Sequence, residues 1–332
     1  MKILFRPPSE WVIEVESSRE RTESKGMVPL SLHAYSPAAW IEISGEDCSS
    51  FLQGQFSNDL VRSDQRPVTY GLWLDAKGKV LADSFVFQQG PDGPYAVFSY
   101  FSPASVILER LEKYIIADDV ELGEQGGEMH GYSLWGERLE SFLAEMGISD
   151  PGEREYGRTS EGGWIFRGRR SRGMSIDLLL PAEAGERFME KARAAGAKPV
   201  DEDALRMERI LSGIPAVPQD IGPRELPQEG GLDVEAVSFN KGCYLGQEVM
   251  ARLRSMGQVR KALVPVAIEG APPPLPASLF QGEKEVGEVR SAAVGEGGWM
   301  GLALIRKQAL AGGLFSFEAG GRGGTLSRLC KV

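Results

Sequence analysis

The order of strand-like and helix-like segments predicts an α+β protein with mainly antiparallel sheets, followed by a small all-β module. Three observations carry this prediction. Residues 39–45 alternate apolar and polar side chains, as a half-buried strand does. The segments 70–75 and 80–88 have strand composition and flank four turn residues, which is typical of a hairpin. After residue 259, short strands alternate with turns rich in glycine and proline, which favours a small barrel.

The first expected unit spans residues 31–123. Gly45 ends its first strand, and Asp47 is a suitable N-cap for the helix that follows. Pro103 suits the first turn of a second helix, in which apolar residues recur at helical spacing. Strands and helices are expected, in chain order, at 39–45, 48–56, 70–75, 80–88, 95–101 and 103–116.

Three further segments complete the expected organisation. Residues 1–30 are polar and mixed and predict a loosely attached N-terminal extension. The second α+β unit spans 124–258, and the C-terminal barrel spans 259–332. Within the second unit, the irregular stretch 214–233 is long enough to predict a functional loop. Strands are expected at 163–168 and 174–180, and helices at 182–195, at 201–213 (capped by Asp201 or Asp203 and ended by Gly213) and before Gly257.

Composition excludes several classes of protein. The 332 residues include 37 basic and 47 acidic side chains, so a net charge of −10 disfavours partners such as nucleic acid or an anionic membrane. Three scattered cysteines, Cys48, Cys243 and Cys330, predict a reducing compartment and no disulfide framework. With only His33 and His130 besides, no intrinsic metal site is expected. The absence of a signal peptide or a long apolar run predicts a cytoplasmic protein.

The octapeptide 241–248, KGCYLGQE, is the most unusual stretch of the sequence. Gly242 and Gly246 allow backbone conformations with positive φ and the close approach of a ligand. Lys241 supplies a positive charge that would lower the pKa of the Cys243 thiol, which could then be nucleophilic, redox-active or metal-binding. The alternative is that Cys243 only packs as a small apolar side chain. The stretch 239–263 holds five basic residues against the single acid Glu248, a patch suited to an anionic ligand or partner.

KGCYLGQE resembles the signature of the YgfZ family, folate-binding proteins of iron–sulfur cluster assembly that are related to the glycine-cleavage T-protein, an aminomethyltransferase. Further segments resemble that family in the same order, so the likeness covers most of residues 39–310. It implies a GcvT/YgfZ-like fold of three subdomains around a central channel, with tetrahydrofolate in the channel. The segments are 51–59, 74–83, 108–122, 226–232 and 301–307.

The resemblance also implies the site residues. Tyr70 and Asp83 lie thirteen residues apart around a hairpin, as a folate-contacting tyrosine and aspartate do in T-proteins. Tyr70 would contact the folate, and Asp83 would orient or accept a proton beside it; the alternative is that Tyr70 is core and Asp83 caps a turn. Asn58 is first interpreted as a C-terminal cap or turn residue after a helix, and the resemblance adds a folate-binding role as the lesser alternative. The motif residues are Lys241, Gly242, Cys243, Tyr244, Gly246, Gln247, Glu248 and Arg252.

One departure from the T-protein pattern affects the ligand. The carboxylate that holds the pterin ring in T-proteins is replaced by Leu211, and an unpaired pterin donor costs about 1–3 kcal/mol. Folate is therefore expected to bind weakly or in another pose, with Glu208 or Glu229 as candidate substitutes. The basic run of Arg167, Arg169, Arg170 and Arg172 is interpreted as a solvated loop, with a partner or polyglutamate contact as the lesser alternative. Trp40 and Trp73 are expected in the core.

Three functions remain open at this stage. The first is a folate-binding accessory protein for iron–sulfur cluster assembly or repair that uses Cys243 and interacts with the assembly machinery or its client enzymes. Any cluster would then be shared with another protein or bound between subunits. The second is a folate-dependent aminomethyltransferase in which Asp83 assists the transfer, so enzymatic activity is left undecided. The third is a binding module whose basic patch docks an acidic partner.

Overall fold

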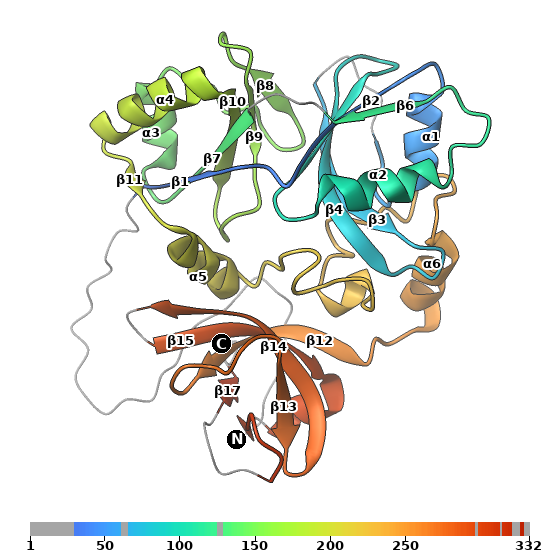
Figure 1. Cartoon of the computed structure of the whole chain (residues 1–332), viewed down its shortest axis with the longest axis vertical. Helices are drawn as coiled ribbons and strands as arrows, with labels where there is room; N and C mark the ends of the chain where they lie inside the picture. The colour runs from blue at the N-terminus through green and yellow to red at the C-terminus, as the bar shows by residue number, and fades with distance from the viewer. Residues whose placement is uncertain are drawn as a thin grey trace.

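A computed structural model gives the arrangement of the chain. It describes residues 30–60, 66–124, 129–295, 298–312, 314–320 and 326–328. Apart from Leu30, the expected N-terminal extension lies outside the described residues, as does Cys330. The described residues form three sheets, two in the upper half of Figure 1 and one in the lower half. Within the described ranges, no helix has the length and apolarity needed to cross a membrane.

The first sheet has five antiparallel strands in the order β3-β4-β5-β2-β6. Its apolar face packs against two helices and buries Leu52, Trp73 and Ile107 in one cluster. Trp40 is also buried, which confirms that both tryptophans belong to the core. The elements are β2 (Ala39–Ser44), α1 (Cys48–Gln55), β3 (Val68–Leu74), β4 (Val80–Gln88), β5 (Tyr95–Ser99), α2 (Ala104–Glu112) and β6 (Glu121–Glu124).

The second sheet has six strands in the order β11-β1-β7-β10-β9-β8. Its strand β1 precedes every strand of the first sheet in the chain. The expected first unit, 31–123, included this segment, but β1 pairs with strands of the second sheet. The reason is the burial of Leu30 and Leu32 in the same cluster as Leu134 and Leu178. The elements are β1 (Ser31–Tyr35), β7 (Met129–Trp135), α3 (Leu139–Glu145), β8 (Tyr156–Arg158), β9 (Trp164–Arg167), β10 (Ser175–Pro181), α4 (Ala182–Ala194) and β11 (Lys198–Pro199).

The two sheets meet through an aromatic interface. Phe85 and Phe87 on β4 contact Phe166 on β9, with ring centroids 5.1 and 5.0 Å apart. Trp40 and Trp164 meet edge to face at 5.4 Å. Aromatic side chains bury large areas and add favourable edge-to-face contacts, so the interface holds the two sheets in a defined position.

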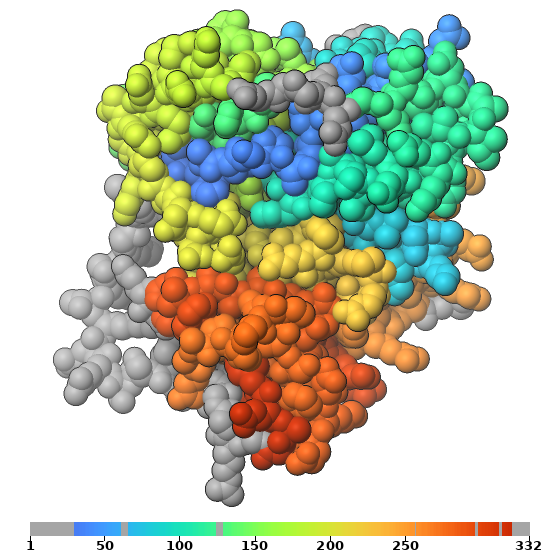
Figure 2. Space-filling model, in the orientation of Figure 1, coloured from blue at the N-terminus to red at the C-terminus, as the bar shows by residue number. Residues whose placement is uncertain are grey.

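The segment that follows the second sheet lies between the two upper lobes and the lower one. It begins with α5 (Glu202–Ser212), whose N-cap Asp201 accepts a hydrogen bond from the Ala204 amide at 2.8 Å. Gly213, with φ of 69°, ends the helix as predicted. The chain then runs through η1 (Pro227–Glu229) to α6 (Gln247–Met256). Figure 2 shows this yellow segment at the surface above the orange and red lobe.

The third sheet is the C-terminal barrel, as predicted. Its strands follow the order β13-β14-β15-β12-β17-β16, and a bridge between Phe280 and Ser316 connects the two edge strands. The sheet therefore closes on itself around an apolar cluster that includes Val266 and Ile305. The elements are β12 (Lys261–Ile268), β13 (Ala277–Gln281), β14 (Lys284–Gly295), β15 (Gly298–Arg306), η2 (Lys307–Gly312), β16 (Leu314–Phe315) and β17 (Leu326–Arg328).

A buried ion pair joins the barrel to the rest of the chain. Arg209 on α5 donates from Nη1 to the Asp220 Oδ2 at 2.5 Å and from Nη2 to the Ser291 Oγ on β14 at 3.0 Å. Ser291 in turn donates to the Asp220 Oδ1. Because Asp220 is 0% exposed, its charge depends on the donors from Arg209 and Ser291 and on the Ala216 amide.

We expect Asp220→Ala to lower the free energy of unfolding by about 3–5 kcal/mol, because it leaves the Arg209 charge buried without its partner. The matched control is Asp203→Ala, which removes an exposed ion pair with Arg206 and should cost less than about 1 kcal/mol. Urea unfolding of both variants measures the difference. Equal losses in the two variants would contradict the anchoring role of Asp220.

Candidate functional site

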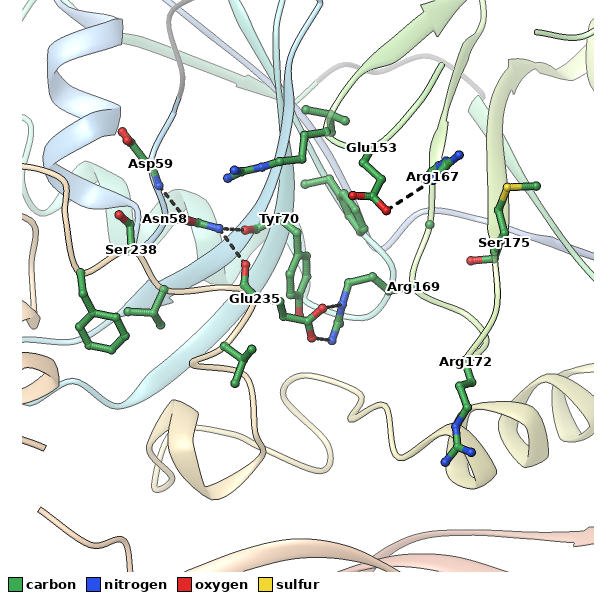
Figure 3. A pocket seen from close by; sticks show the side chains of 18 of the residues that line it. Asn58, Asp59, Tyr70, Glu153, Arg167, Arg169, Arg172, Ser175, Glu235 and Ser238 are labelled. Carbon is green, nitrogen blue, oxygen red and sulfur yellow. Dashed lines mark hydrogen bonds and ion pairs between the residues drawn. The ribbon is translucent and has the colours of Figure 1, made fainter. Parts of the chain in front are cut away.

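A cavity of about 960 Å³ lies between the two α+β sheets and the segment 234–240. Among the described residues, five arginines and three acidic side chains line it, although the whole chain is acidic. Figure 3 shows side chains from both sheets and from the segment around one open space. The charged lining residues are Arg154, Arg167, Arg169, Arg172, Arg254, Asp59, Glu153 and Glu235; the aromatic ones are Tyr70, Phe85 and Phe239.

Tyr70 and Asp83 lie together on the β3–β4 hairpin, but only Tyr70 lines the cavity. The Tyr70 hydroxyl donates to the Asp83 Oδ2 at 2.9 Å, and Oδ1 accepts from Ser99 at 3.0 Å and Ser102 at 2.8 Å. Burial raises the pKa of Asp83, while the hydroxyl donors and the Arg169 charge lower it. Asp83 is thus one hydrogen bond away from the cavity, behind the tyrosine.

Arg169 covers the ring of Tyr70. Its guanidinium carbon lies 4.0 Å from the ring centroid, and its Nε and Nη2 both donate to the Glu235 carboxylate, Nε at 3.0 Å. Burial opposes the charge of Arg169, yet Tyr70 and Glu235 keep its pKa above the usual value. The interpretation of this run as a solvated loop is therefore wrong for Arg169.

It is also wrong for Arg170, which is 2% exposed. Its guanidinium carbon lies 3.8 Å from the centroid of the Tyr100 ring, and its Nε donates to the Ser133 Oγ at 3.3 Å. Tyr100 and Ser133 also donate to the buried Asp177, at 2.7 and 2.5 Å. The run could not be recognised as buried because its aromatic and acidic partners come from distant strands. Its glycine Gly168 lines the cavity where a Cβ would overlap the Asp177 carboxylate.

Two residues that follow α1, Ser57 and Asn58, join two walls of the cavity. The Asn58 Nδ2 donates to the Tyr70 carbonyl at 2.7 Å and to the Glu235 carbonyl at 2.9 Å, as Figure 3 shows. The Ser57 hydroxyl donates to the Ala236 carbonyl at 2.6 Å and accepts from the Leu72 amide at 2.8 Å. Asn58 does line the cavity, but both of its amide hydrogens are used by the backbone.

The expected substitutes for the missing pterin carboxylate lie outside the cavity lining, as does Leu211. Glu229 accepts from the Leu226 amide at 2.8 Å and so caps the short helix η1. Glu208 on α5 accepts from the Ser212 hydroxyl at 3.3 Å, and burial raises its pKa against the opposing charge of the lining residue Arg172.

Lys241 binds backbone carbonyls directly after α1. Its Nζ donates to the Phe56 carbonyl at 2.9 Å and to the Asn58 carbonyl at 2.8 Å, and burial lowers its pKa to about 8. This contact differs from the expected role of Lys241 beside the Cys243 thiol. Cys243 is exposed, unbonded to another cysteine, and outside the cavity lining.

The remaining motif residues shape the loop that leads into α6. Gly246 has φ of 88°, and a Cβ there would lie 2.9 Å from the Asp75 carbonyl, whereas Gly242 has neither constraint. Tyr244 is buried, and burial raises its pKa to about 12. Gln247, Glu248 and Arg252 lie on α6, the last two exposed.

The basic stretch around the motif does not form one surface. Lys241 is buried, and Lys261 lies 4.0 Å from the Glu225 carboxylate. Arg254 instead lines the cavity, with its guanidinium carbon 4.4 Å from the ring centroid of Phe239. The sequence placed Arg254 within the patch and gave Arg169 a ligand contact only as the lesser alternative, and it did not indicate the cavity residues Glu235 and Phe239. Within the described part of the chain, no group of three or more His, Cys, Asp and Glu side chains is placed to hold a metal ion.

The chain is similar in sequence or fold to several known proteins. Residues 260–328 match the family model described as the CAF17 C-terminal beta-barrel domain. The chain is 30% identical over 256 residues to the "tRNA-modifying protein YgfZ" of Vibrio vulnificus, covering 76% of this chain and 74% of that protein. It is 31% identical over 258 residues to the "Iron-sulfur cluster assembly factor IBA57 homolog, mitochondrial" of Neosartorya fischeri.

The match to the fungal protein covers 71% of this chain and 57% of the fungal protein, so the chain spans little more than half the length of that relative. A similar fold occurs in the glycine cleavage system aminomethyltransferase T from Bartonella henselae, with a TM-score of 0.75 and 19% identity. The structural match covers 91% of this chain and 85% of that one. The expected aminomethyltransferase-like fold is thereby confirmed.

We expect Gly246→Ala to lower the free energy of unfolding by about 2–4 kcal/mol, because a left-handed backbone and the Asp75 carbonyl both oppose a Cβ. Gly242→Ala, two residues from Tyr244 in the same loop, serves as the control and should stay within about 0.5 kcal/mol of the wild type. Denaturant unfolding followed by circular dichroism measures both. A loss in Gly242→Ala as large as that in Gly246→Ala would refute this assignment.

Proposed function

The chain belongs to the YgfZ/IBA57 family, and from that premise we propose that it is a folate-binding accessory protein for iron–sulfur cluster assembly or repair. The observation that carries the proposal is the arginine-lined cavity beside Tyr70, in a chain whose relatives bear the name of an iron–sulfur assembly factor. Its partners would be reduced folate and the iron–sulfur assembly machinery or its client enzymes.

The cavity suits a reduced folate in size and chemistry. Its volume of about 960 Å³ lies at the upper end of the usual range for small-molecule sites. Tyr70, Phe85 and Phe239 offer apolar surface for a flat pteridine and an aminobenzoyl ring. Arginines from several elements offer donors for the carboxylates of the glutamyl tail. A net-acidic chain with this local lining would attract an anion to the cavity rather than to its whole surface.

Cys243 is the group that we propose for the chemistry of the cluster. Its thiol is exposed at the surface, where a second protein or a second subunit could reach it. A cluster is here the cargo, and one cysteine supplies one of its ligands. The nearby exposed side chains Glu248 and Arg252 would contact the partner.

Aminomethyl transfer is the second candidate, and the Tyr70–Asp83 pair is the observation that favours it. The raised pKa of Asp83 suits a proton acceptor, and its link to the cavity runs through the Tyr70 hydroxyl. Among the described residues, the Asp83 carboxylate accepts hydrogen bonds from the hydroxyl groups of Tyr70, Ser99 and Ser102, and it does not line the cavity. We therefore rank transfer second.

Two expectations from composition stay predictions. A cytoplasmic location is one, since the fungal relative is named as a mitochondrial protein. The absence of a nucleic-acid partner is the other, since the bacterial relative is named for tRNA modification.

We expect calorimetric titration with 5-formyltetrahydrofolate to show binding that Tyr70→Ala weakens at least tenfold, because the variant removes an aromatic face of the cavity. The matched control is Tyr114→Ala, which removes another tyrosine covered by an arginine, Arg110, outside the cavity lining. Wild-type protein without measurable binding would rule out the folate proposal, and equal losses in both variants would move the site elsewhere.

We expect Cys243→Ala to abolish rescue of a strain with defective iron–sulfur enzymes while leaving the melting temperature unchanged, because the thiol is exposed. Cys48→Ala is the control: this buried thiol donates only to the Asp92 carbonyl, so rescue should persist at permissive temperature. Full rescue by Cys243→Ala would overturn the proposed role of the thiol.

A further inference from the structure

The Arg169 guanidinium occupies a place that resembles a ligand site. One flat face of it lies against the Tyr70 ring, at 4.0 Å, and one edge donates two hydrogen bonds to the Glu235 carboxylate. An aromatic face combined with a carboxylate at its edge is the arrangement that a flat nitrogen heterocycle needs. Figure 3 shows the guanidinium beside the Glu235 carboxylate and close to the Tyr70 ring.

The platform is fixed without Arg169. The Asn58 amide holds the carbonyls of Tyr70 and Glu235 at 2.7 and 2.9 Å, and the Tyr70 hydroxyl is held by Asp83. The ring and the carboxylate-bearing backbone would therefore keep their positions if the guanidinium left. The backbone of Arg169 is itself held by the Tyr100 hydroxyl at 3.4 Å, so only the side chain has to rotate.

Glu235 is the lining carboxylate best placed for a ring stacked on Tyr70. Asp59 accepts a hydrogen bond from Gln53 at 2.6 Å, on the side of the cavity nearer α1. Glu153 is 85% exposed and pairs with Arg167 at 3.6 Å. Glu235 alone of these three described carboxylates is joined to the face of Tyr70, through Arg169.

The hydrogen-bond donors on the ring edge that faces Glu235 determine which class of ligand fits. A guanidinium presents two parallel N–H donors, and a 2-amino-4-oxopyrimidine ring presents the same pair from its ring N–H and its amino group. Both are flat, and both can stack on a tyrosine. A ring with oxygen in place of the 2-amino group would instead direct a carbonyl at the carboxylate, which is unfavourable.

We propose that Glu235 is the ligand-binding carboxylate of this cavity, that it selects flat heterocycles with an amidine-type donor edge, and that Arg169 occupies this position in the empty protein. The inference deepens the proposed function, because the pteridine of folate carries such an edge, and it supplies the acceptor missing at Leu211. Ligand binding then requires Arg169 to leave Tyr70 and Glu235, so Arg169 competes with the ligand.

The proposal predicts that the loss of one cavity arginine, Arg169, raises ligand affinity instead of lowering it. Removing a cavity arginine should weaken an anionic ligand, but removing Arg169 should strengthen a ligand that binds through its ring. Pterin, which has the 2-amino group and no glutamyl tail, separates the two effects. Lumazine differs by a 2-oxo group in place of the 2-amino group and serves as the matched ligand.

The test is fluorescence titration of the full chain with pterin and with lumazine. We expect Arg169→Met to bind pterin at least about fivefold more tightly than the wild type, since the competing pair is gone. Arg169→Met combined with Glu235→Gln should lose about tenfold relative to Arg169→Met alone. Lumazine should gain less than about twofold from Arg169→Met. Arg167→Met, which removes another ion-paired arginine of the cavity, should leave pterin affinity within about twofold.

Several outcomes would overturn the inference. Pterin that binds Arg169→Met no more tightly than the wild type excludes competition by Arg169. Equal gains for lumazine and pterin show that only space was created, and Glu235→Gln without effect excludes the carboxylate. Melting curves confirm that each variant is folded.

The pterin titrations and the calorimetric titration with 5-formyltetrahydrofolate together separate this inference from the folate proposal. Glu235-dependent pterin binding without any binding of 5-formyltetrahydrofolate would keep the inference and reject the folate function. Folate binding that ignores both residues would do the reverse.

Discussion

Two residues that follow α1 hold the candidate site together, and the rest of the cavity depends on them. Ser57 and Asn58 bind the backbone of β3 on one side and that of residues 235 and 236 on the other. Lys241 then binds the carbonyls of Phe56 and Asn58 from the same segment. Because backbone groups buried without partners are costly, this short stretch satisfies both walls at once and determines the distance between them. Asn58 and Lys241 therefore act as scaffold, and the surfaces left for a ligand are Tyr70, Glu235 and the arginines.

The local charge around the cavity differs from the net charge of the whole chain. A chain with a net charge of −10 places five arginines around one cavity, and two of them pair with carboxylates of the same lining. Low-dielectric walls and aromatic faces strengthen the attraction between the remaining positive charge and an anion that enters. Arg170 and Asp177 are both buried charged residues. Tyr100 contacts each of them, with its ring against Arg170 and its hydroxyl donating to Asp177, and so replaces water around both charges.

The sequence predicted the fold well because it is encoded in local patterns: the hairpin around Asp75, the cap at Asp201 and the stop at Gly213 each depend on neighbouring residues. It predicted the Tyr70–Asp83 pair through a family likeness. It failed where burial depends on distant partners. Arg169 and Arg170 look like a solvated run until Tyr70 and Tyr100 from the other sheet cover them. Lys241 looks like a partner of its neighbour Cys243 until α1 presents two carbonyls to it.

The position of β1 has a consequence for how the chain assembles on the ribosome. This strand lies between β7 and β11 in the second sheet, yet every strand of the first sheet separates it from them in the chain. The first sheet can complete its ladder as soon as β6 has emerged, whereas β1 waits until Met129–Trp135 and then Lys198–Pro199 have been synthesised. During that interval Leu30 and Leu32 of the nascent chain have not yet met their sheet partners, and this early apolar strand is then most open to chaperones and to wrong partners.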